Sequence, residues 1–345
     1  MANSSSAITK TAALLMKSLS SRNKDIISRR FGLKTGKKET LESIGKSYGI
    51  TRERVRQIEE FSLNQLAKSV ASSPDIVKYV SLAKEILAGN GGVMKESEMF
   101  KAFSGNDREN VVNASLVFVL ALAGEPVRFG ENDLFHSFWA VDKQGADLFK
   151  TNVLEVVRVL EGNKSPVAAS ELALFVANSG VRGTKDFNML LNISKELGKN
   201  VFGEVGLVGW AEVKPKGVRD KAYLILKKES QPKHFSEIAK LINETGFSSK
   251  KANVQTVHNE LIKDSRFVLV GRGMYGLSEW GYKPGTVKDV LVDVLRSSNK
   301  PLAKADLVAK VMNARMVKEN TILLNLQDSK VFSKKEDGSY VLRKV

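Results

Sequence analysis

The chain has no cysteine among its 345 residues, which excludes disulfides, thiolate zinc sites and cysteine nucleophiles. Long apolar runs are also absent. The longest, "VVNASLVFVLALAG" at 111–124, is interrupted by Asn113 and Ser115 and falls short of the ~20 residues that a membrane span needs. The apolar run at 12–16 is too short for a signal-peptide core. We therefore expect 111–124 to be a buried helix in a cytoplasmic, nucleoid-associated protein with no membrane partner.

Recognisable catalytic patterns are missing as well. The sequence shows no Walker loop, no paired-carboxylate frame and no Ser-His-Asp signature, and His136, His234 and His258 lie far apart. The stretch "GRGMYG" at 271–276 fits the dinucleotide pattern G-x-G-x-x-G, but "LSEWGYKPG" follows where that pattern needs a helix. We interpret it as a hairpin turn. We expect no enzymatic activity, no cofactor and no metal.

Positive charge is what the chain has in excess. Its 54 lysines and arginines against 38 aspartates and glutamates give a net charge of +16. This excess favours a polyanionic partner, which is either nucleic acid or an acidic membrane surface. The length allows several domains, each with its own core.

Two short helices joined by a glycine turn are predicted between residues 40 and 66. Thr40 caps the first helix, Gly49 supplies the turn and Thr51 caps the second. The apolar positions have helical spacing on both helices: Leu41, Ile44, Val55, Ile58, Leu63 and Leu66. This arrangement is typical of a helix-turn-helix.

The second helix begins with a polar cluster, "RERVRQ" at 52–57. Arg52, Glu53, Arg56 and Gln57 share one face, because residues three and four apart are neighbours on a helix. In a helix-turn-helix, the N-terminal residues of the second helix reach the base edges, and these residue types can read guanine, adenine and cytosine. The alternative is an ordinary solvated charged face.

Residues 22–69, above all "RRFGL" and "TLESIGKSYGITRERVRQIE", resemble region 4 of bacterial primary sigma factors. The resemblance implies a domain that reads the −35 promoter element and contacts the β-flap of RNA polymerase. It places base-reading positions on Arg52, Glu53 and Gln57, with Arg56 beside them. The phosphate-contacting positions that it implies are Arg22, Arg30, Thr40 and Arg54. Phe61 and Leu66 are expected to leave an apolar surface for the flap.

The sequence departs from a complete sigma factor in one respect. Sigma factors open promoters with a preceding region 2 that captures unpaired bases on aromatic residues. Only 21 residues precede the helix-turn-helix here, none of them aromatic, and nothing downstream has that pattern. We therefore do not expect a stand-alone promoter-melting factor.

A recurring unit of helices followed by a hairpin begins after Pro74. "GLVGW" at 206–210 matches "GLSEW" at 276–280, with weaker counterparts in "DLFHSFW" at 133–139 and "VFSKKEDGSYVL" at 331–342. Helices followed by a hairpin predict winged helices, and we expect Trp210 and Trp280 to be largely buried beneath the wings. The predicted fold is mainly α with small β-hairpins, an N-terminal helix-turn-helix followed by tandem winged-helix-like domains. The expected ranges are a tail at 1–21, the helix-turn-helix at 22–72, and units at 75–146, 147–229, 230–285 and 286–345.

Residues 231–284 are similar to the HARE helix-turn-helix family. The similarity rests on Phe235, Ile238, Leu241, "DSRFVLVGRGMYGL" and Trp280. That family includes the δ subunit of RNA polymerase in Gram-positive bacteria, and restriction-related and chromatin proteins, and its members bind DNA or protein. Basic pairs such as Lys250–Lys251 and Lys227–Lys228 are either solvated faces or phosphate contacts.

The function predicted from these patterns is sequence-specific binding of promoter-like duplex DNA, as a transcription regulator or an accessory factor of RNA polymerase. Core RNA polymerase, through its β-flap, is the second expected partner. Two alternatives stay open. One is a protein-interaction scaffold that docks on RNA polymerase. The other is an accessory subunit of a DNA restriction or modification system.

Overall fold

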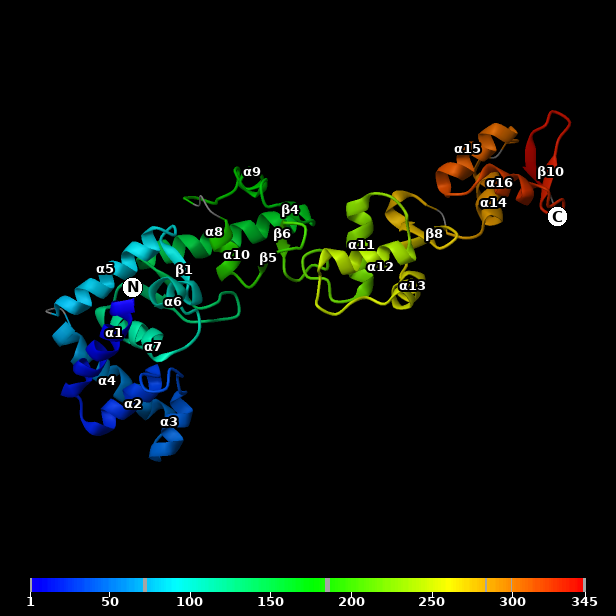
Figure 1. Cartoon of the computed structure of the whole chain (residues 1–345). Helices are drawn as coiled ribbons and strands as arrows, with labels where there is room; N and C mark the ends of the chain where they lie inside the picture. Colours follow the sequence, from blue (N-terminus) through cyan, green and yellow to red (C-terminus); the bar gives the residue numbers. More distant parts are fainter. Residues whose placement is uncertain (1, 71–72, 184–186, 283, 299, 344–345) are drawn as a thin grey trace. The chain divides into compact units, whose positions relative to one another are not determined.

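The computed structural model describes residues 2–70, 73–183, 187–282, 284–298 and 300–343 (Figure 1). The chain divides into two compact units. Unit 1 comprises Met1–Lys199 and Gly203–Val208, and unit 2 comprises Asn200–Phe202 and Gly209–Val345. Mainly α-helical segments with small antiparallel sheets make up both, as predicted, and no described helix is long and apolar enough to cross a membrane.

Unit 1 begins with helices only. They are α1 (Ala2–Leu15), a 3-10 turn at Met16–Ser18, α2 (Ser21–Phe31), α3 (Leu41–Tyr48) and α4 (Arg52–Val70). Helices α2, α3 and α4 form the predicted helix-turn-helix. The predicted tail is largely helical, and its Ile8, Ala12 and Met16 are buried in the core of unit 1.

Four repeats with one order of elements follow: helix, strand, helix, helix, strand, strand. Repeat 1 contains α5 (Pro74–Ala88), β1 (Val93–Lys95), α6 (Glu96–Ser104), α7 (Val111–Ala123), β2 (Val127–Phe129) and β3 (Phe138–Ala140). Repeat 2 contains α8 (Lys143–Asn163), β4 (Val167–Ala168), α9 (Leu172–Phe175), α10 (Asn188–Ile193), β5 (Leu197–Lys199) and β6 (Glu204–Leu207). This order is that of a winged helix, in which the third helix is the counterpart of α4 in the helix-turn-helix.

Unit 2 holds the remaining two repeats. Repeat 3 contains α11 (Val218–Glu229), β7 (Lys233–His234), α12 (Phe235–Thr245), α13 (Val254–Lys263), β8 (Phe267–Gly271) and β9 (Met274–Leu277), with a 3-10 turn at Ser278–Trp280. Repeat 4 contains α14 (Val287–Ser298), α15 (Lys304–Ala314), α16 (Glu319–Leu326), β10 (Phe332–Lys334) and β11 (Tyr340–Leu342). Its first strand is reduced to a bridge between Leu302 and Tyr340.

The last strand of each of the first three repeats is the central one of its small sheet. The orders are β1-β3-β2, β4-β6-β5 and β7-β9-β8, and all pairings are antiparallel. Strands β6 and β9 both end at the leucine of their "GL" pair, Leu207 and Leu277, so the sequence echo reflects equivalent positions. "GRGMYG" spans the turn between β8 and β9, which is a hairpin turn as predicted.

Helix α7 is the centre of the unit 1 core. It is buried on nearly all sides, because α1, α4 and α5 pack around it (Figure 1). Its Phe118 meets Phe31 of α2 edge to face, with ring centroids 5.2 Å apart. At Gly36 (φ +80°) a β-carbon would lie 2.7 Å from the Cα of Asn110, the residue that caps α7. The helix-turn-helix and repeat 1 therefore share one core.

A charged network strengthens this joint. Glu96, at the start of α6, accepts two hydrogen bonds from Arg128 of β2, and Lys38 of the α2–α3 loop lies 3.7 Å from the same carboxylate. Burial by itself raises the pKa of Glu96, but the hydrogen bonds and charge of Arg128 and the charge of Lys38 hold that pKa below its usual range. Burial lowers the pKa of Lys38. The network links the helix-turn-helix loop to the sheet of repeat 1.

The core of repeat 3 includes α11. Helix α11 packs on α12 and α13 through Ala222, Ile225 and Leu226, all of them buried. Repeat 3 therefore begins near residue 218, ahead of the boundary predicted near 230. Repeat 4 has a separate core of α14, α15, α16 and the β10–β11 hairpin.

The three tryptophans differ in how completely they are buried. Trp210 and Trp280 are partly buried, and Trp280 packs against the repeat 3 core, which is compatible with the prediction. Each follows the end of its strand by three residues. Trp139 lies within β3 and is completely buried. Burial here depends on whether the indole falls inside the strand or after it.

Candidate nucleic-acid interface

The helix-turn-helix is held by a small core of its own and by two caps. Ile26, Ile44 and Val55, one from each helix, are fully buried against one another. The Thr40 hydroxyl accepts a hydrogen bond from the Ser43 amide at 3.1 Å, and Thr51 accepts one from the Arg54 amide at 3.2 Å. Gly49 turns the chain between α3 and α4 in the left-handed conformation at φ +64°, where a side chain would be strained. The two caps and the glycine turn were predicted, and together with the small core they fix the start of α4.

The four residues expected to read bases are exposed at that start. Glu53 and Glu60 both bind Arg56: its Nη2 lies 2.8 Å from Glu53 Oε1, and its Nη1 lies 3.0 Å from Glu60 Oε2. The hydrogen bonds from Arg56 lower the pKa of the Glu53 carboxyl. Arg52 forms no ion pair with any described residue. The face therefore presents the guanidinium of Arg52, unpaired among the described residues, the carboxylate of Glu53, and Arg56, which is held between Glu53 and Glu60.

Gln57 joins this face to a second feature, an open groove between α2 and α4. Arg54 Nη1 donates to Gln57 Oε1 at 3.1 Å. The groove has a volume of about 510 Å³, and its lining residues are Arg22, Asn23, Arg54, Gln57, Ile58 and Phe61. Arg22 and Arg54 form no ion pair with any described carboxylate, and the Arg22 guanidinium lies over the Tyr48 ring, 5.4 Å from its centroid. Neither positive charge is therefore neutralised by an acidic side chain of the described residues. Two of the four expected phosphate contacts thus share one groove.

The other two expected phosphate contacts have structural partners. Arg30 donates to Glu59 Oε2 and to the Glu39 carbonyl, each at 3.1 Å, which ties α2 to α4 and to the intervening loop. The Thr40 hydroxyl oxygen accepts the capping hydrogen bond, and its proton is left to donate. Of these two residues, Arg30 is the one whose side chain is used more fully in hydrogen bonds within the protein.

Arg29 was not identified from the sequence. It binds Glu39 through two hydrogen bonds of 2.9 and 2.7 Å and donates to the Ser47 hydroxyl at 2.7 Å. These hydrogen bonds lower the pKa of the Glu39 carboxyl. The contact partners lie ten and eighteen residues away, so no helical spacing predicts them. Arg29 fixes α3 against α2 and thereby positions α4.

Unit 2 presents a second exposed polar helix face, on α13. Asn253 caps this helix by accepting from the Gln255 and Thr256 amides at 2.8 and 3.3 Å. Gln255 Nε2 donates to Asn259 Oδ1 at 3.2 Å, and the side chains of Gln255, Thr256 and Asn259 are exposed. The amide pair has i,i+4 spacing, which was a detectable signal in the sequence.

Comparison with known proteins identifies both segments. Residues 15–68 match the family sigma-70, region 4. Residues 218–280 match the HARE-HTH family, whose description names a restriction endonuclease HTH domain. The sigma factor SigA of Lactococcus lactis subsp. cremoris is 40% identical over 60 residues, which is 17% of this chain and 16% of that relative. The chain therefore matches about one sixth of this curated relative.

The region 4 segment ends differently from the expectation. Phe61 is exposed (64%), but Leu66 is fully buried in the core that the segment shares with repeat 1. The apolar surface expected from both residues is therefore reduced to Phe61. The cause is α7, which packs against α4 and covers the side on which Leu66 lies.

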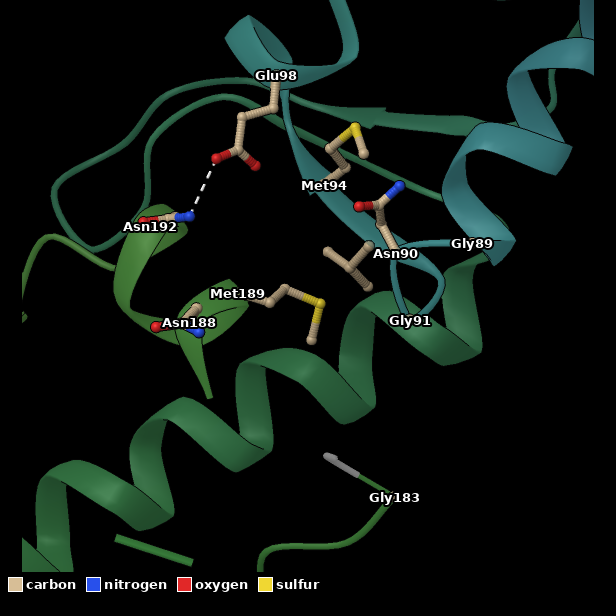
Figure 2. A pocket seen from close by; sticks show the side chains of 10 residues that line it. Gly89, Asn90, Gly91, Met94, Glu98, Gly183, Asn188, Met189 and Asn192 are labelled. Carbon is tan, nitrogen blue, oxygen red and sulfur yellow. Dashed lines mark hydrogen bonds between the residues drawn. The ribbon is translucent and has the colours of Figure 1, made fainter. Parts of the chain in front are cut away.

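The third helices of repeats 1 and 2 offer no comparable face. Helix α7 is buried, and α10 has six residues, packs on β1, and buries Leu190 and Ile193. An open pocket of about 480 Å³ lies between α10 and repeat 1, with Met94 and Met189 among its lining residues (Figure 2). At its edge, Asn192 Nδ2 donates to Glu98 Oε1 at 3.0 Å (Figure 2). The third helices of both repeats are thus used for packing inside unit 1.

The two segments with exposed polar helix faces are also the segments with an excess of basic residues. Residues 22–69 hold twelve lysines and arginines and six acidic residues, and residues 218–345 hold 24 and 14. Residues 74–217, between them, hold 16 and 18. Among the described residues, no group of three His, Asp or Glu side chains is placed to hold a metal ion. The two family matches support a DNA-binding role related to RNA polymerase.

Proposed function

We propose that this chain binds promoter-like duplex DNA in a sequence-specific way and regulates transcription, or accompanies RNA polymerase, in the cytoplasm. The observation that carries the proposal is the exposed polar face at the start of α4, on a segment that matches sigma-70 region 4. The basic excess of that segment supports it, because phosphate neutralisation supplies most of the non-specific affinity for DNA.

The two groups of residues would have separate tasks. Arg22 and Arg54, in the groove between α2 and α4, would hold backbone phosphates and set the position of the duplex. Arg52, Glu53, Arg56 and Gln57 would enter the major groove with α4 and contact base edges. On binding, Arg54 would leave the Gln57 oxygen for a phosphate, which would free the whole amide to read a base.

Glu53 provides the sharpest test, because a carboxylate that faces a polyanion is unfavourable unless it accepts from a base. Glu60 is a matched control: it also pairs with Arg56 and is equally exposed, but it lies two turns further along α4. We expect Glu53→Ala to leave non-specific affinity equal or higher while discrimination falls by roughly 10–100-fold. Glu60→Ala should leave discrimination unchanged.

The measurement is selection of bound sites from random duplexes with the full chain, followed by titration of the selected and a scrambled site. An unchanged site preference in Glu53→Ala, or no preference in the unaltered chain, would exclude base reading by α4.

A second candidate function, docking on RNA polymerase, is favoured by Phe61. A phenyl ring exposed to this extent at the end of the region 4 segment is available for an apolar contact. Retention of core polymerase, or of its isolated β-flap, by the immobilised full chain tests it. Phe61→Ala should abolish retention, whereas Leu324→Ala, which removes an equally exposed side chain from α16, should not. Equal retention by both variants would exclude this surface.

A further inference from the structure

We propose that one copy of this chain holds two separate DNA duplexes at once, the first on α4 of unit 1 and the second on α13 of unit 2. The inference rests on the proposed function for the first site and adds a second duplex as partner.

The α13 surface has the composition of a DNA-reading helix. Its underside, Val257 and Leu261, is buried in the repeat 3 core, and its outer side carries the amides of Gln255 and Asn259 and the Thr256 hydroxyl. Gln and Asn pair with adenine in the major groove. Lys250 and Lys251, both exposed, precede the helix and form no ion pair with any described residue.

The hairpin of repeat 3 lies beside this helix. His258 of α13 stacks on Phe235 with ring centroids 4.3 Å apart and meets Tyr275 of β9 at 5.9 Å. At the hairpin turn, a β-carbon on Gly273 would contact His234 and Phe235. Arg272 is exposed at the same turn. Two exposed lysines thus precede the candidate reading helix and one exposed arginine lies at the turn of the wing beside it, and their positive charge is complementary to that of a duplex.

The segment between the two helices argues against one continuous footprint. Residues 74–217 carry more acidic than basic side chains, and α7 and α10 are occupied by packing. Phosphates gain nothing from such a surface. The α4 and α13 surfaces belong to different compact units, and each has its own cations and its own exposed polar helix, so each can hold a duplex of its own.

The experiment captures one duplex with another. A bead-bound duplex that carries the selected site is loaded with the full chain, washed, and offered a fluorescent duplex of unrelated sequence. Double-stranded RNA replaces the fluorescent duplex in a parallel arm. The variants are Lys250→Ala/Lys251→Ala for the second surface and Arg52→Ala/Gln57→Ala for the first. The matched control is Lys78→Ala/Lys101→Ala, which removes two exposed lysines from repeat 1.

We expect the unaltered chain and the Lys78→Ala/Lys101→Ala control to capture the fluorescent DNA. Lys250→Ala/Lys251→Ala should bind the beads normally but lose capture by at least about tenfold, because losing two phosphate contacts weakens binding to any duplex. Arg52→Ala/Gln57→Ala should be retained more weakly on the beads and should lose the preference for the selected site over a scrambled one. Circular dichroism checks that each variant is folded.

Three results would overturn the proposal. They are no capture by a chain that is bound to the beads, equal capture by Lys250→Ala/Lys251→Ala, and capture of RNA in place of DNA. Equal capture would mean that two copies, each using α4, hold the duplexes. Failure of the unaltered chain to bind the beads would instead refute the proposed function of α4.

Discussion

The third helices of repeats 1 and 3 occupy equivalent positions in one topology but have opposite surroundings. Helix α7 is mostly apolar and buried on nearly all sides, whereas α13 buries one side and exposes amides on the other. The difference lies in what surrounds each repeat: α1, α4 and α5 pack on α7, while the outer side of α13 faces solvent. A winged-helix topology is therefore no sign of DNA binding in itself, and the surface of the third helix decides.

The largest effect that separates the two helices concerns stability. Leu116→Ala on α7 removes a fully buried side chain, so we expect a loss of about 3–5 kcal/mol in the free energy of unfolding. Ile262→Ala on α13 removes a side chain that is 63% exposed and should cost under ~1 kcal/mol. Urea denaturation, with amide hydrogen exchange of residues 111–123 to identify the unit affected, measures both. Similar losses would show that α7 is not a core helix.

The charged network at the joint should give the next largest effect. Glu96→Gln leaves Arg128 and Lys38 without their buried carboxylate, and we expect a loss of about 3 kcal/mol at neutral pH. The folded-state pKa of Glu96 is lowered, so its contribution is complete above the unfolded value near ~4.3 and disappears as pH falls through the folded value. The difference in the free energy of unfolding between Glu96→Gln and the unaltered chain should therefore disappear at acidic pH. Glu98→Gln, an exposed carboxylate on the same helix, is the control.

The DNA-facing residues should show smaller effects of two kinds. Arg52→Ala should cost roughly 1–3 kcal/mol on the selected site and relax selectivity at one position. Arg22→Ala should weaken binding about equally on all sequences and flatten the salt dependence by roughly one unit. Titrations on selected and scrambled duplexes at several salt concentrations distinguish the two. If both variants lost affinity equally on both duplexes, Arg52 would be a phosphate contact.

The smallest effect is expected at Phe61. Because its ring is largely exposed, Phe61→Ala should change the free energy of unfolding by no more than ~0.5 kcal/mol. Urea denaturation measures this change and compares it with that of Leu66→Ala, which should lower the free energy of unfolding by about 2–5 kcal/mol. A large loss in Phe61→Ala would place its ring in the core.

The sequence predicted those parts of the fold that depend on local signals. Thr40, Gly49 and Thr51 mark helix ends by chemistry that acts over three or four residues, and the repeated "GL" pairs mark equivalent strands. The candidate face on α4 was predictable for the same reason. What could not be predicted is packing between distant segments. Leu66 and α7 are separated by more than forty residues, and no pattern in either indicates their contact.

The tryptophans show a second limit. A shared motif places Trp210 and Trp280 after a strand, but it does not indicate that Trp139, in the weaker counterpart of that motif, is the one that is completely buried. The Arg29–Glu39 pair was missed because ion pairs across a loop leave no periodic trace in the sequence. Local chemistry thus predicted elements, and tertiary contacts decided exposure.

The shared core also sets an order of events during synthesis. The region 4 segment is complete once residue 70 has been added, but Leu66 and Ile27 lack the part of their core that α7 provides until α7 ends at residue 123. At about 5–20 residues per second, the ribosome needs roughly 3–10 s to make the residues between. During that interval the helix-turn-helix exposes apolar side chains, and fragments that stop before α7 share this defect permanently. A piece that contains α4 therefore keeps its complete core only when it includes repeat 1.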